Sequence, residues 1–404
     1  MNRAETHFFF ASCPRGLEAV LVNELTSLNA SHLLAVDGGV HFKGPLELCY
    51  AANLHSRVAS RVLWRVARAA YRNETDIYEQ CHRLPWPTWF DCQRTLRVNV
   101  SAIKASVKSL DFITLRIKDA VCDVFRSHGG QRPSIDTHNP DIRVHAFLTA
   151  TELTVYIDTS GDPLFKRGYR REAGEAPLKE NLAAGMIYLS GWSPGRVFLD
   201  PFCGSGTLLC EAALMSAHQA PGLHRSFAFE KLHSFDPSAW SQQKKMATDQ
   251  QTTIDPDTLL GSDLRGDAIS MARANLDSLG FVDAVSLKQA NFFEFPPPAS
   301  SGILVANPPY GVRMEDRESL ASFYPKLGDT LKKRFSGWTA YILSSDPQLA
   351  KGIGLAASKR TPLFNGALEC RLFEYKMIAG TMRRIKADKT SNPTTPAPNT
   401  NNPT

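Results

Sequence analysis

The chain has 404 residues, 43% of them hydrophobic, and carries 46 Lys and Arg against 40 Asp and Glu, a formal net charge of +6. That length predicts two or three domains, and the mild positive charge permits an anionic partner such as nucleic acid without requiring one. No run reaches the ~18–20 apolar residues that span a membrane, the N-terminus lacks a signal peptide's apolar run, and the eight cysteines and eleven histidines show no metal-ligand spacing, so we expect a cytoplasmic protein with no membrane partner and no metal.

The first 175 residues show the pattern of an α+β region. Strands and helices follow one another without regular alternation, and the short turn at 150–151 favours a hairpin. The predicted elements are a strand at His7–Ala11, a helix from Gly16 to Leu28, strands at Val40–Phe42 and Thr95–Val100, a helix over Phe112–Ser127, and strands at Ile142–Thr149 and Glu152–Thr159.

Five arginines recur in this region at intervals of three and four residues: Arg57, Arg61, Arg65, Arg68 and Arg72. On a continuous helix they would form one basic stripe suited to a phosphate backbone. Residues 61–71 also fit a strand, and in that case the arginines are separate surface charges.

From about Pro177 the pattern changes to alternating strands and helices, which predicts a parallel sheet with right-handed crossovers. Ligands of such sheets bind beyond the carboxyl ends of the strands. The predicted helices cover Leu178–Leu189, Thr207–Ala217, Asp267–Leu279 and Ser319–Phe335, and the predicted strands cover Arg196–Leu199, Thr258–Gly261, Ala284–Gln289, Gly302–Ala306 and Trp338–Leu343.

The run Asp200-Pro-Phe-Cys-Gly-Ser-Gly-Thr207 follows the first of these strands and opens a helix. Gly204 and Gly206 allow a sharp turn and close approach of a ligand, and the helix N-terminus offers free N–H groups to a carboxylate. Asp200 suits an ammonium group. Leu209 stands where a dinucleotide fingerprint needs a third glycine, which weakens a pyrophosphate interpretation. A purely structural strand–helix turn is the alternative.

Two shorter signals follow the next two strands. Asp263 is placed to accept hydrogen bonds from the hydroxyls of a ribose. A helix N-cap is the equal alternative, although Asp267 is better placed for that role. Asn291 has the amide needed for an adenine edge, and a turn-forming Asn is the alternative. Phe202 or Phe292 is expected to stack on the ring.

The most informative run is Asn307-Pro308-Pro309-Tyr310-Gly311, directly after an apolar strand. Two consecutive prolines fix the backbone and leave neighbouring carbonyls free as acceptors. Asn307 Oδ1 and the Pro308 carbonyl can each accept an N–H from an aromatic amine, which localises the lone pair of its nitrogen for attack on a methyl group. Tyr310 offers a face on which a base can stack. We expect alignment rather than a strong base to drive the reaction.

These motifs, in this order, resemble class I S-adenosylmethionine (SAM) methyltransferases that act on exocyclic amines. Residues 176–183 resemble the helix that lines the methionine pocket in those enzymes, which implies that Glu180 and Asn181, with Thr207, contact the cofactor. The segments at 118–120, 132–134, 140–144 and 160–170 resemble THUMP-containing methyltransferases, and over roughly residues 5–385 the chain is similar to the bacterial 23S rRNA guanine-N2 methyltransferases.

The resemblance implies an α/β fold in which a Rossmann-like methyltransferase sheet follows an α+β ferredoxin-like and THUMP region that binds RNA. The implied segments are 1–43 (ferredoxin-like), 44–155 (THUMP), 156–175 (basic linker), 176–385 (methyltransferase) and a disordered tail at 386–404, with no room for a second methyltransferase domain. Many relatives carry Asp at the position of Asn291, so the adenine contact there is the least supported. The implied RNA-binding residues are Lys118, Arg132, Lys166, Arg167 and Arg170, although a salt-bridge role between the two halves fits the last three as well.

The leading hypothesis is therefore a SAM-dependent enzyme that methylates N2 of a guanine in 23S rRNA. The alternatives are an adenine-N6 methylase of DNA or RNA, and a non-catalytic RNA-binding assembly factor that kept the fold. A dehydrogenase is disfavoured by Leu209 and by the Asn-Pro-Pro-Tyr run, which hydride transfer does not need.

Overall fold

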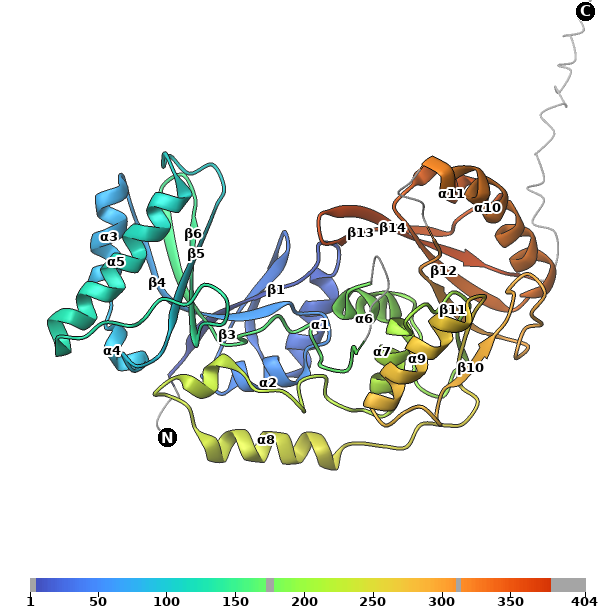
Figure 1. Cartoon of the computed structure of the whole chain (residues 1–404), viewed down its shortest axis with the longest axis horizontal. Helices are drawn as coiled ribbons and strands as arrows, with labels where there is room; N and C mark the ends of the chain where they lie inside the picture. The colour runs from blue at the N-terminus through green and yellow to red at the C-terminus, as the bar shows by residue number, and fades with distance from the viewer. Residues whose placement is uncertain (1–4, 172–177, 310–313, 379–404) are drawn as a thin grey trace, which may run out of the picture.

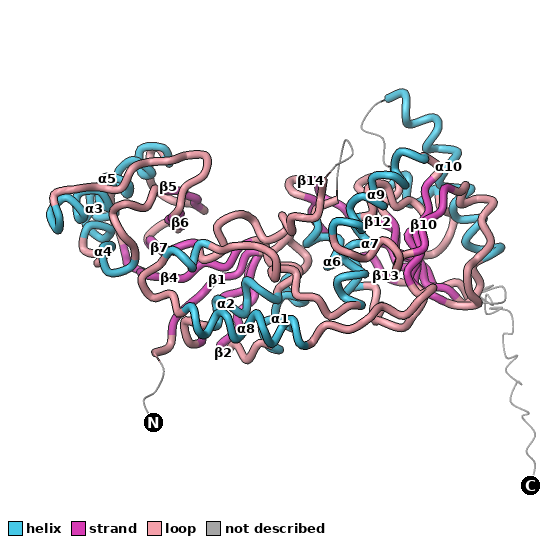
Figure 2. The backbone as a smooth tube through the Cα atoms, turned by 60° about the horizontal axis from the view of Figure 1, so that its bottom comes forward, coloured by secondary structure: helices cyan, strands magenta, loops and turns pink. Residues whose placement is uncertain are grey.

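The computed structural model describes residues 5–171, 178–309 and 314–378 and contains two seven-stranded sheets. The two sheets follow one another along the long axis of the molecule, the N-terminal sheet towards one end and the C-terminal sheet towards the other (Figure 1; Figure 2). No helix in these three ranges is long and apolar enough to cross a membrane.

The first sheet is mostly antiparallel and has the order β2-β3-β1-β4-β7-β6-β5. One row of paired residues across it, Phe42, Phe9, Trp64, Ile157, Val144 and Val98, is buried. Helices α1, α2 and α5 pack against this sheet. The strands are β1 (His7–Ser12), β2 (Ser31–Val36), β3 (Gly39–Gly44), β4 (Arg61–Ala70), β5 (Leu96–Ala102), β6 (Ile142–Leu148) and β7 (Glu152–Asp158), and the helices are α1 (Glu18–Ser27), α2 (Leu48–His55), α3 (Glu74–His82), α4 (Trp86–Trp89) and α5 (Leu110–Gly129).

The second sheet has the order β10-β9-β8-β11-β12-β14-β13, and its first five strands are parallel. The chain starts at β8, adds strands on one side, and returns to the other side at β11, so the strand order reverses between β8 and β11. The strands are β8 (Phe198–Asp200), β9 (Leu259–Asp263), β10 (Ser286–Gln289), β11 (Gly302–Ala306), β12 (Trp338–Ser344), β13 (Lys359–Asn365) and β14 (Leu368–Lys376), and the helices are α6 (Glu180–Leu189), α7 (Thr207–Ser216), α8 (Pro237–Asp249), α9 (Gly266–Ser278), α10 (Met314–Arg334) and α11 (Pro347–Gly352).

The segment between α7 and β9 crosses back to the N-terminal half. Its helix α8 lies beside α2 (Figure 1; Figure 2), and a short 3-10 turn, η1 (Ala228–Lys231), precedes it. The Tyr50 ring of α2 stacks on Phe229 with centroids 4.4 Å apart and meets Trp240 edge-on at 6.2 Å. Gly222 packs so closely that a Cβ there would lie 2.7 Å from the Asn53 carbonyl oxygen. The two halves therefore share a buried aromatic contact.

The predicted fold class is confirmed: an α+β region precedes a Rossmann-like sheet. The helical alternative for the arginine series is wrong, because Arg61–Ala70 is strand β4 in the middle of the first sheet. Separate surface charges do not describe the whole series either, since Arg57 is buried and donates to the Leu214 and Gln219 carbonyls. The tail predicted at 386–404 lies outside the described residues.

Candidate functional site

Three of the predicted motifs meet at the carboxyl edge of the second sheet, where the strand order reverses. Asp200 ends β8, Asp263 ends β9, and Asn307 directly follows β11. Strand β8 pairs with both neighbours, through Asp200 opposite Gly261 on one side and Leu199 opposite Leu304 on the other. A crevice at such a reversal is where open α/β sheets bind ligands.

The glycine-rich turn between β8 and α7 depends on its glycines for two different reasons. Gly206 has φ +78°, and a Cβ there would lie 2.9 Å from the Ala272 Cβ of α9. Gly204 has φ +53° and open space around its Cβ position. Gly206 therefore lets α7 approach α9, while Gly204 leaves the outer part of the turn open for a ligand.

Asp200 is a buried carboxylate at the base of this turn, 2% exposed. Its Oδ1 accepts the Phe202 N–H at 3.3 Å, and no cationic side chain of the described ranges pairs with it. Burial raises the pKa of its carboxyl well above the ordinary value, and the nearby Asp263 adds to the rise. A buried acid in this state favours a ligand that brings a positive charge.

Asp263 ties the ends of the two strands together. Its carboxylate accepts the Gly204 N–H at 2.9 Å and the Arg265 N–H at 3.0 Å. The side chain is half-buried, so it supports the glycine turn while part of it stays exposed. Asp267 is not the N-cap of α9, because the cap is Arg265 and Asp267 lies in the first turn.

The aromatic and amide residues expected to contact the adenine are mostly engaged within the protein. Phe292 is 2% exposed and packs on Phe335 at 5.2 Å in the core, whereas Phe202 is half-buried and meets Phe292 edge-on at 5.3 Å. Asn291 uses its carbonyl for the Phe293 N–H and its amide for Glu294. The turn-forming interpretation of Asn291 fits this geometry, and Phe202 is the better placed of the two rings for stacking.

The loop after β11 holds an unused acceptor. Asn307 Oδ1 is buried and accepts no hydrogen bond from the residues that the structure describes, although a buried polar atom of this kind is costly when unpaired. Pro308 is buried and Pro309 exposed, and the Pro309 carbonyl accepts the Tyr324 hydroxyl at 3.4 Å. Tyr310 lies outside the described residues. The free acceptor is what the predicted amine-binding role requires.

The start of α6 is bound to the glycine turn through Arg170. The Arg170 guanidinium donates to Glu180 Oε1 at 2.9 Å and to the Thr207 hydroxyl at 3.1 Å. Asn181, one residue further along α6, points to the N-terminal half, where its amide donates to the Ser60 hydroxyl at 3.0 Å and to the Val58 carbonyl at 3.3 Å. Glu180 therefore borders the crevice, and Asn181 faces away from it.

Two of the five residues predicted to bind RNA are used inside the protein. Arg167 has a side chain only 3% exposed and pairs with the buried Glu211 at 3.4 Å, besides donating to the Arg57 and Leu164 carbonyls. Arg170 holds Glu180 and Thr207. Both fit the alternative role of a connector between the halves, because neither guanidinium is free for a phosphate. Lys166 and Arg132 are exposed, and Lys118 pairs with Asp119.

Sequence reasoning missed Asn275, a support of the same turn. This buried residue of α9 donates to the Ser205 carbonyl at 2.9 Å and accepts the Arg171 N–H at 3.0 Å. The available signal was an Asn inside an otherwise apolar helix face, where Asn is neither a good helix former nor a core residue.

Three family models match the chain. Residues 8–63 match the RlmL ferredoxin-like domain, residues 71–158 match the THUMP domain, and residues 167–374 match the RMKL-like methyltransferase domain.

Among curated proteins, the ribosomal RNA large subunit methyltransferase K/L of Shewanella frigidimarina is 38% identical over 93% of this chain and 54% of its own length. The candidate RNA methyltransferase slr0064 of Synechocystis sp. is 37% identical over 93% of this chain and 98% of its own. The chain thus spans about half the length of the K/L relatives and nearly all of slr0064. Among solved structures, SMU.472, a candidate methyltransferase in complex with SAH, is 30% identical with a TM-score of 0.83, covering 94% of this chain and all of that one.

Proposed function

The chain belongs to the family with an RMKL-like methyltransferase domain joined to a THUMP domain, and from that premise we propose that it transfers the methyl group of SAM to N2 of a guanine in 23S ribosomal RNA. The observation that carries the proposal lies at the reversal between β8 and β11. There a glycine turn above the buried Asp200 meets Asn307 Oδ1, which has no partner among the described residues.

The residues at the glycine turn fit SAM. The open outer part of the turn at Gly204 leaves room for a ligand, and Asp200 lacks the positive partner that the ammonium of an amino acid would supply. Asp263 is placed for the ribose hydroxyls, Phe202 for the adenine ring, and Glu180, Gly206 and Thr207 hold the turn in shape. When bound, SAM supplies an electrophilic methyl group. That SMU.472 was solved with SAH, the demethylated form of SAM, supports this assignment.

The loop at 307–310 then has to hold and activate the amine. We propose that Asn307 Oδ1 and the Pro308 carbonyl accept the two N–H groups of the guanine amine, which turns its lone pair towards the methyl group. Pro309 keeps the loop rigid, and Tyr310 stacks on the base. A guanine within a helix has to leave its stack to reach this loop, at an unstacking cost of about a few kcal/mol.

The test is the Asn307→Ala variant, with Asn23→Ala on the exposed face of α1 as the matched control. Loss of one preorganised hydrogen-bond partner at the reacting group is expected to lower kcat on 23S rRNA by about 100-fold or more, while the SAM Kd from calorimetry stays unchanged. Methylation at the wild-type rate by Asn307→Ala would contradict the activating role.

Two other functions remain as outcomes of the same assays. Mass spectrometry of digested product RNA separates N2-methylguanine from N6-methyladenine, because the motif at 307–310 polarises either amine. Absence of SAM binding in the wild-type protein would favour a non-catalytic assembly factor.

We further propose a role for each segment of the chain. The ferredoxin-like part (1–43) and the THUMP part (44–155) bind RNA, 156–175 links them to the catalytic part at 176–385, and the protein works in the cytoplasm. The boundary at 43 lies at the end of β3, inside one continuous sheet, so the first two parts move together.

A further inference from the structure

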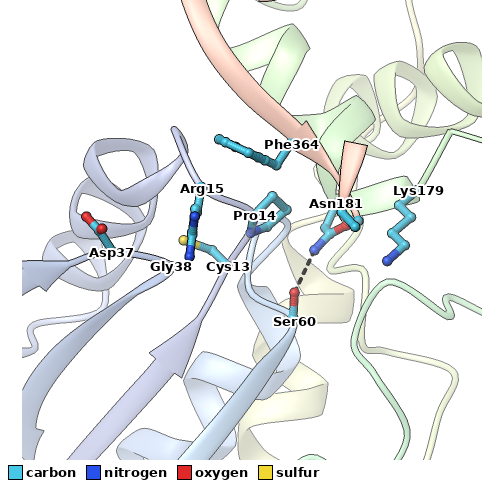
Figure 3. A pocket seen from close by; sticks show the side chains of 11 residues that line it. Cys13, Pro14, Arg15, Asp37, Gly38, Ser60, Lys179, Asn181 and Phe364 are labelled. Carbon is cyan, nitrogen blue, oxygen red and sulfur yellow. Dashed lines mark hydrogen bonds between the residues drawn. The ribbon is translucent and has the colours of Figure 1, made fainter. Parts of the chain in front are cut away.

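A cavity of about 520 Å³ lies between the N-terminal half and the catalytic half (Figure 3). Its walls come from the β1–α1 turn, the β2–β3 turn, the start of α6 and the β13–β14 turn. This volume falls within the ~300–1,000 Å³ that small-molecule sites occupy. Figure 3 labels the side chains that line it, among them Cys13, Pro14, Arg15, Asp37, Ser60, Lys179, Asn181 and Phe364.

The cavity lies at the same edge of the second sheet as the loop at 307–310, here called the reaction loop. Strand β14 runs antiparallel to β12, with Arg371 opposite Ser344 at the carboxyl end of β12. The β13–β14 turn at 366–367 therefore extends beyond that end, on the side where Asp200 and Asn307 lie. A Cβ at Gly16 would lie 2.1 Å from the Pro362 carbonyl oxygen, which shows how closely the N-terminal half closes the cavity.

Two cations face the cavity without a carboxylate partner. Within the described ranges neither Arg15 nor Lys179 forms an ion pair. Asp37 is exposed at the rim, and it too forms no ion pair there. Arg15 lies over the Phe364 ring at 5.5 Å, and the Lys179 ammonium lies 5.0 Å from the Phe165 centroid. Both charges are thus held in place by aromatic rings and stay available to an anion.

The start of α6 adds two further polar features. Lys179 is its N-cap and makes no side-chain capping bond, and within the described ranges no other side chain accepts from the first N–H groups of this ten-residue helix. Asn181 lines the cavity and is fully buried; its Oδ1 accepts no hydrogen bond from any described residue, while its amide is held by Ser60. A helix N-terminus with two cations suits a phosphate, and an unpaired carbonyl oxygen suits a base or ribose donor.

We propose that this cavity binds one single-stranded nucleotide of the RNA substrate, next to the guanine that is methylated. Arg15, Lys179 and the α6 N-terminus take its phosphate, the part of the Phe364 ring that Arg15 leaves uncovered packs against its base, and Asn181 Oδ1 accepts a hydrogen bond from it. The inference rests on the proposed function, because the reaction loop and the cavity would hold neighbouring nucleotides of one strand.

The test measures binding of a fluorescein-labelled single-stranded RNA 12-mer to the full chain over a range of salt concentrations. Arg15→Ala is expected to raise the RNA Kd about tenfold and to reduce the slope of log K against log salt by about 0.7, the value for one lost phosphate contact with a single strand. Phe364→Leu keeps the apolar volume, so it is expected to raise Kd about tenfold with an unchanged slope. Lys245→Ala on α8, whose side chain is 77% exposed, is the control and should change neither.

Calorimetric titration with SAM and methylation of 23S rRNA separate the remaining outcomes. Unchanged SAM affinity in Arg15→Ala and Phe364→Leu, together with weaker RNA binding, supports the nucleotide site. Unchanged RNA binding in both variants overturns it, as does a loss of SAM affinity alone, which would make the cavity an extension of the cofactor site. If the wild-type protein methylates no rRNA while the variants still bind RNA more weakly, the proposed function fails and so does the placement next to a methylated guanine, whereas binding of a nucleotide in the cavity is supported.

Discussion

Two buried atoms at the reaction site are left without the partner their chemistry calls for. The Asp200 carboxylate lacks a cation within the described structure, and Asn307 Oδ1 lacks a donor. Burying an unsatisfied polar group costs about 1–3 kcal/mol, and more when the group is charged. Such a cost in the ligand-free protein is expected where the missing partners are supplied by ligands.

Asp200→Asn is therefore expected to stabilise the ligand-free protein and to abolish SAM binding. The amide keeps the acceptor for the Phe202 N–H and removes the buried charge. Each kcal/mol gained raises Tm by about 2–4 °C for a domain of this size. Differential scanning calorimetry with and without SAM checks both effects, and a variant that is less stable yet binds SAM normally would contradict the argument.

The difference in stability between Asp200→Asn and the wild type is expected to depend on pH, and the burial of Asp200 fixes the direction of that dependence. The folded-state pKa of Asp200 is raised above its unfolded value, so the stabilising effect of the neutral carboxyl is complete below about pH 4 and is lost as pH rises through the folded pKa. The stability advantage of Asp200→Asn over the wild type should grow as pH rises from about 4 and then level off. Urea titrations at several pH values measure it.

At the scale of elements, the glycine turn connects strand, helix and neighbouring helix. Gly206→Ala forces a left-handed φ on alanine and places a Cβ 2.9 Å from Ala272. Gly280 has a similar φ of +76° with open space around it, so Gly280→Ala carries the backbone cost alone, about 1–2 kcal/mol. Gly206→Ala should cost more than its control and also weaken SAM binding. Adding Ala272→Gly should recover the excess, and failure to do so would place the cost elsewhere.

Local pattern predicted the elements that carry the site, and for a physical reason. The strand Gly302–Ala306 is an apolar run ended by Asn-Pro-Pro, so periodicity and backbone chemistry agree, and the structure has the strand at those same bounds. Helix α8 and the hairpin β13–β14 were not predicted, because α8 is mostly polar and the hairpin lacks strict alternation. The position of α8 depends on α2, more than 180 residues away in the chain, and the position of the hairpin depends on the edge of the sheet. A local sequence pattern encodes neither contact.

At the scale of the whole molecule, the halves are joined by a buried ion pair. Arg167 pairs with Glu211. Burial raises the pKa of the Glu211 carboxyl above its ordinary value, and the charge of Arg167 offsets part of this rise. Arg167→Met leaves a buried acid without its partner, so it is expected to lower the free energy of unfolding by roughly 3–5 kcal/mol. Adding Glu211→Gln should restore part of this loss.

Urea unfolding measures the effect, and Lys166→Met at the exposed neighbour is the matched control, expected to stay within about 0.5 kcal/mol of the wild type. Equal effects of Arg167→Met and Lys166→Met would show that the pair contributes little. Charge alone in the sequence did not separate these two residues, since only the fold decides that Arg167 points inwards and Lys166 outwards.

If the chain acts on RNA as proposed, the packing of α8 against α2 bears on which RNA can serve as its substrate. Because Tyr50 of α2 packs on Phe229 and Trp240 of the segment between α7 and β9, this contact helps to set the distance between the first sheet and the loop that follows β11. An RNA whose bound helix and target guanine are separated by a different distance would bind to the first sheet, but its guanine would not reach the loop at 307–310. If the chain methylates a guanine of ribosomal RNA as proposed, distance along the RNA fold would then select the target without any base having to be recognised.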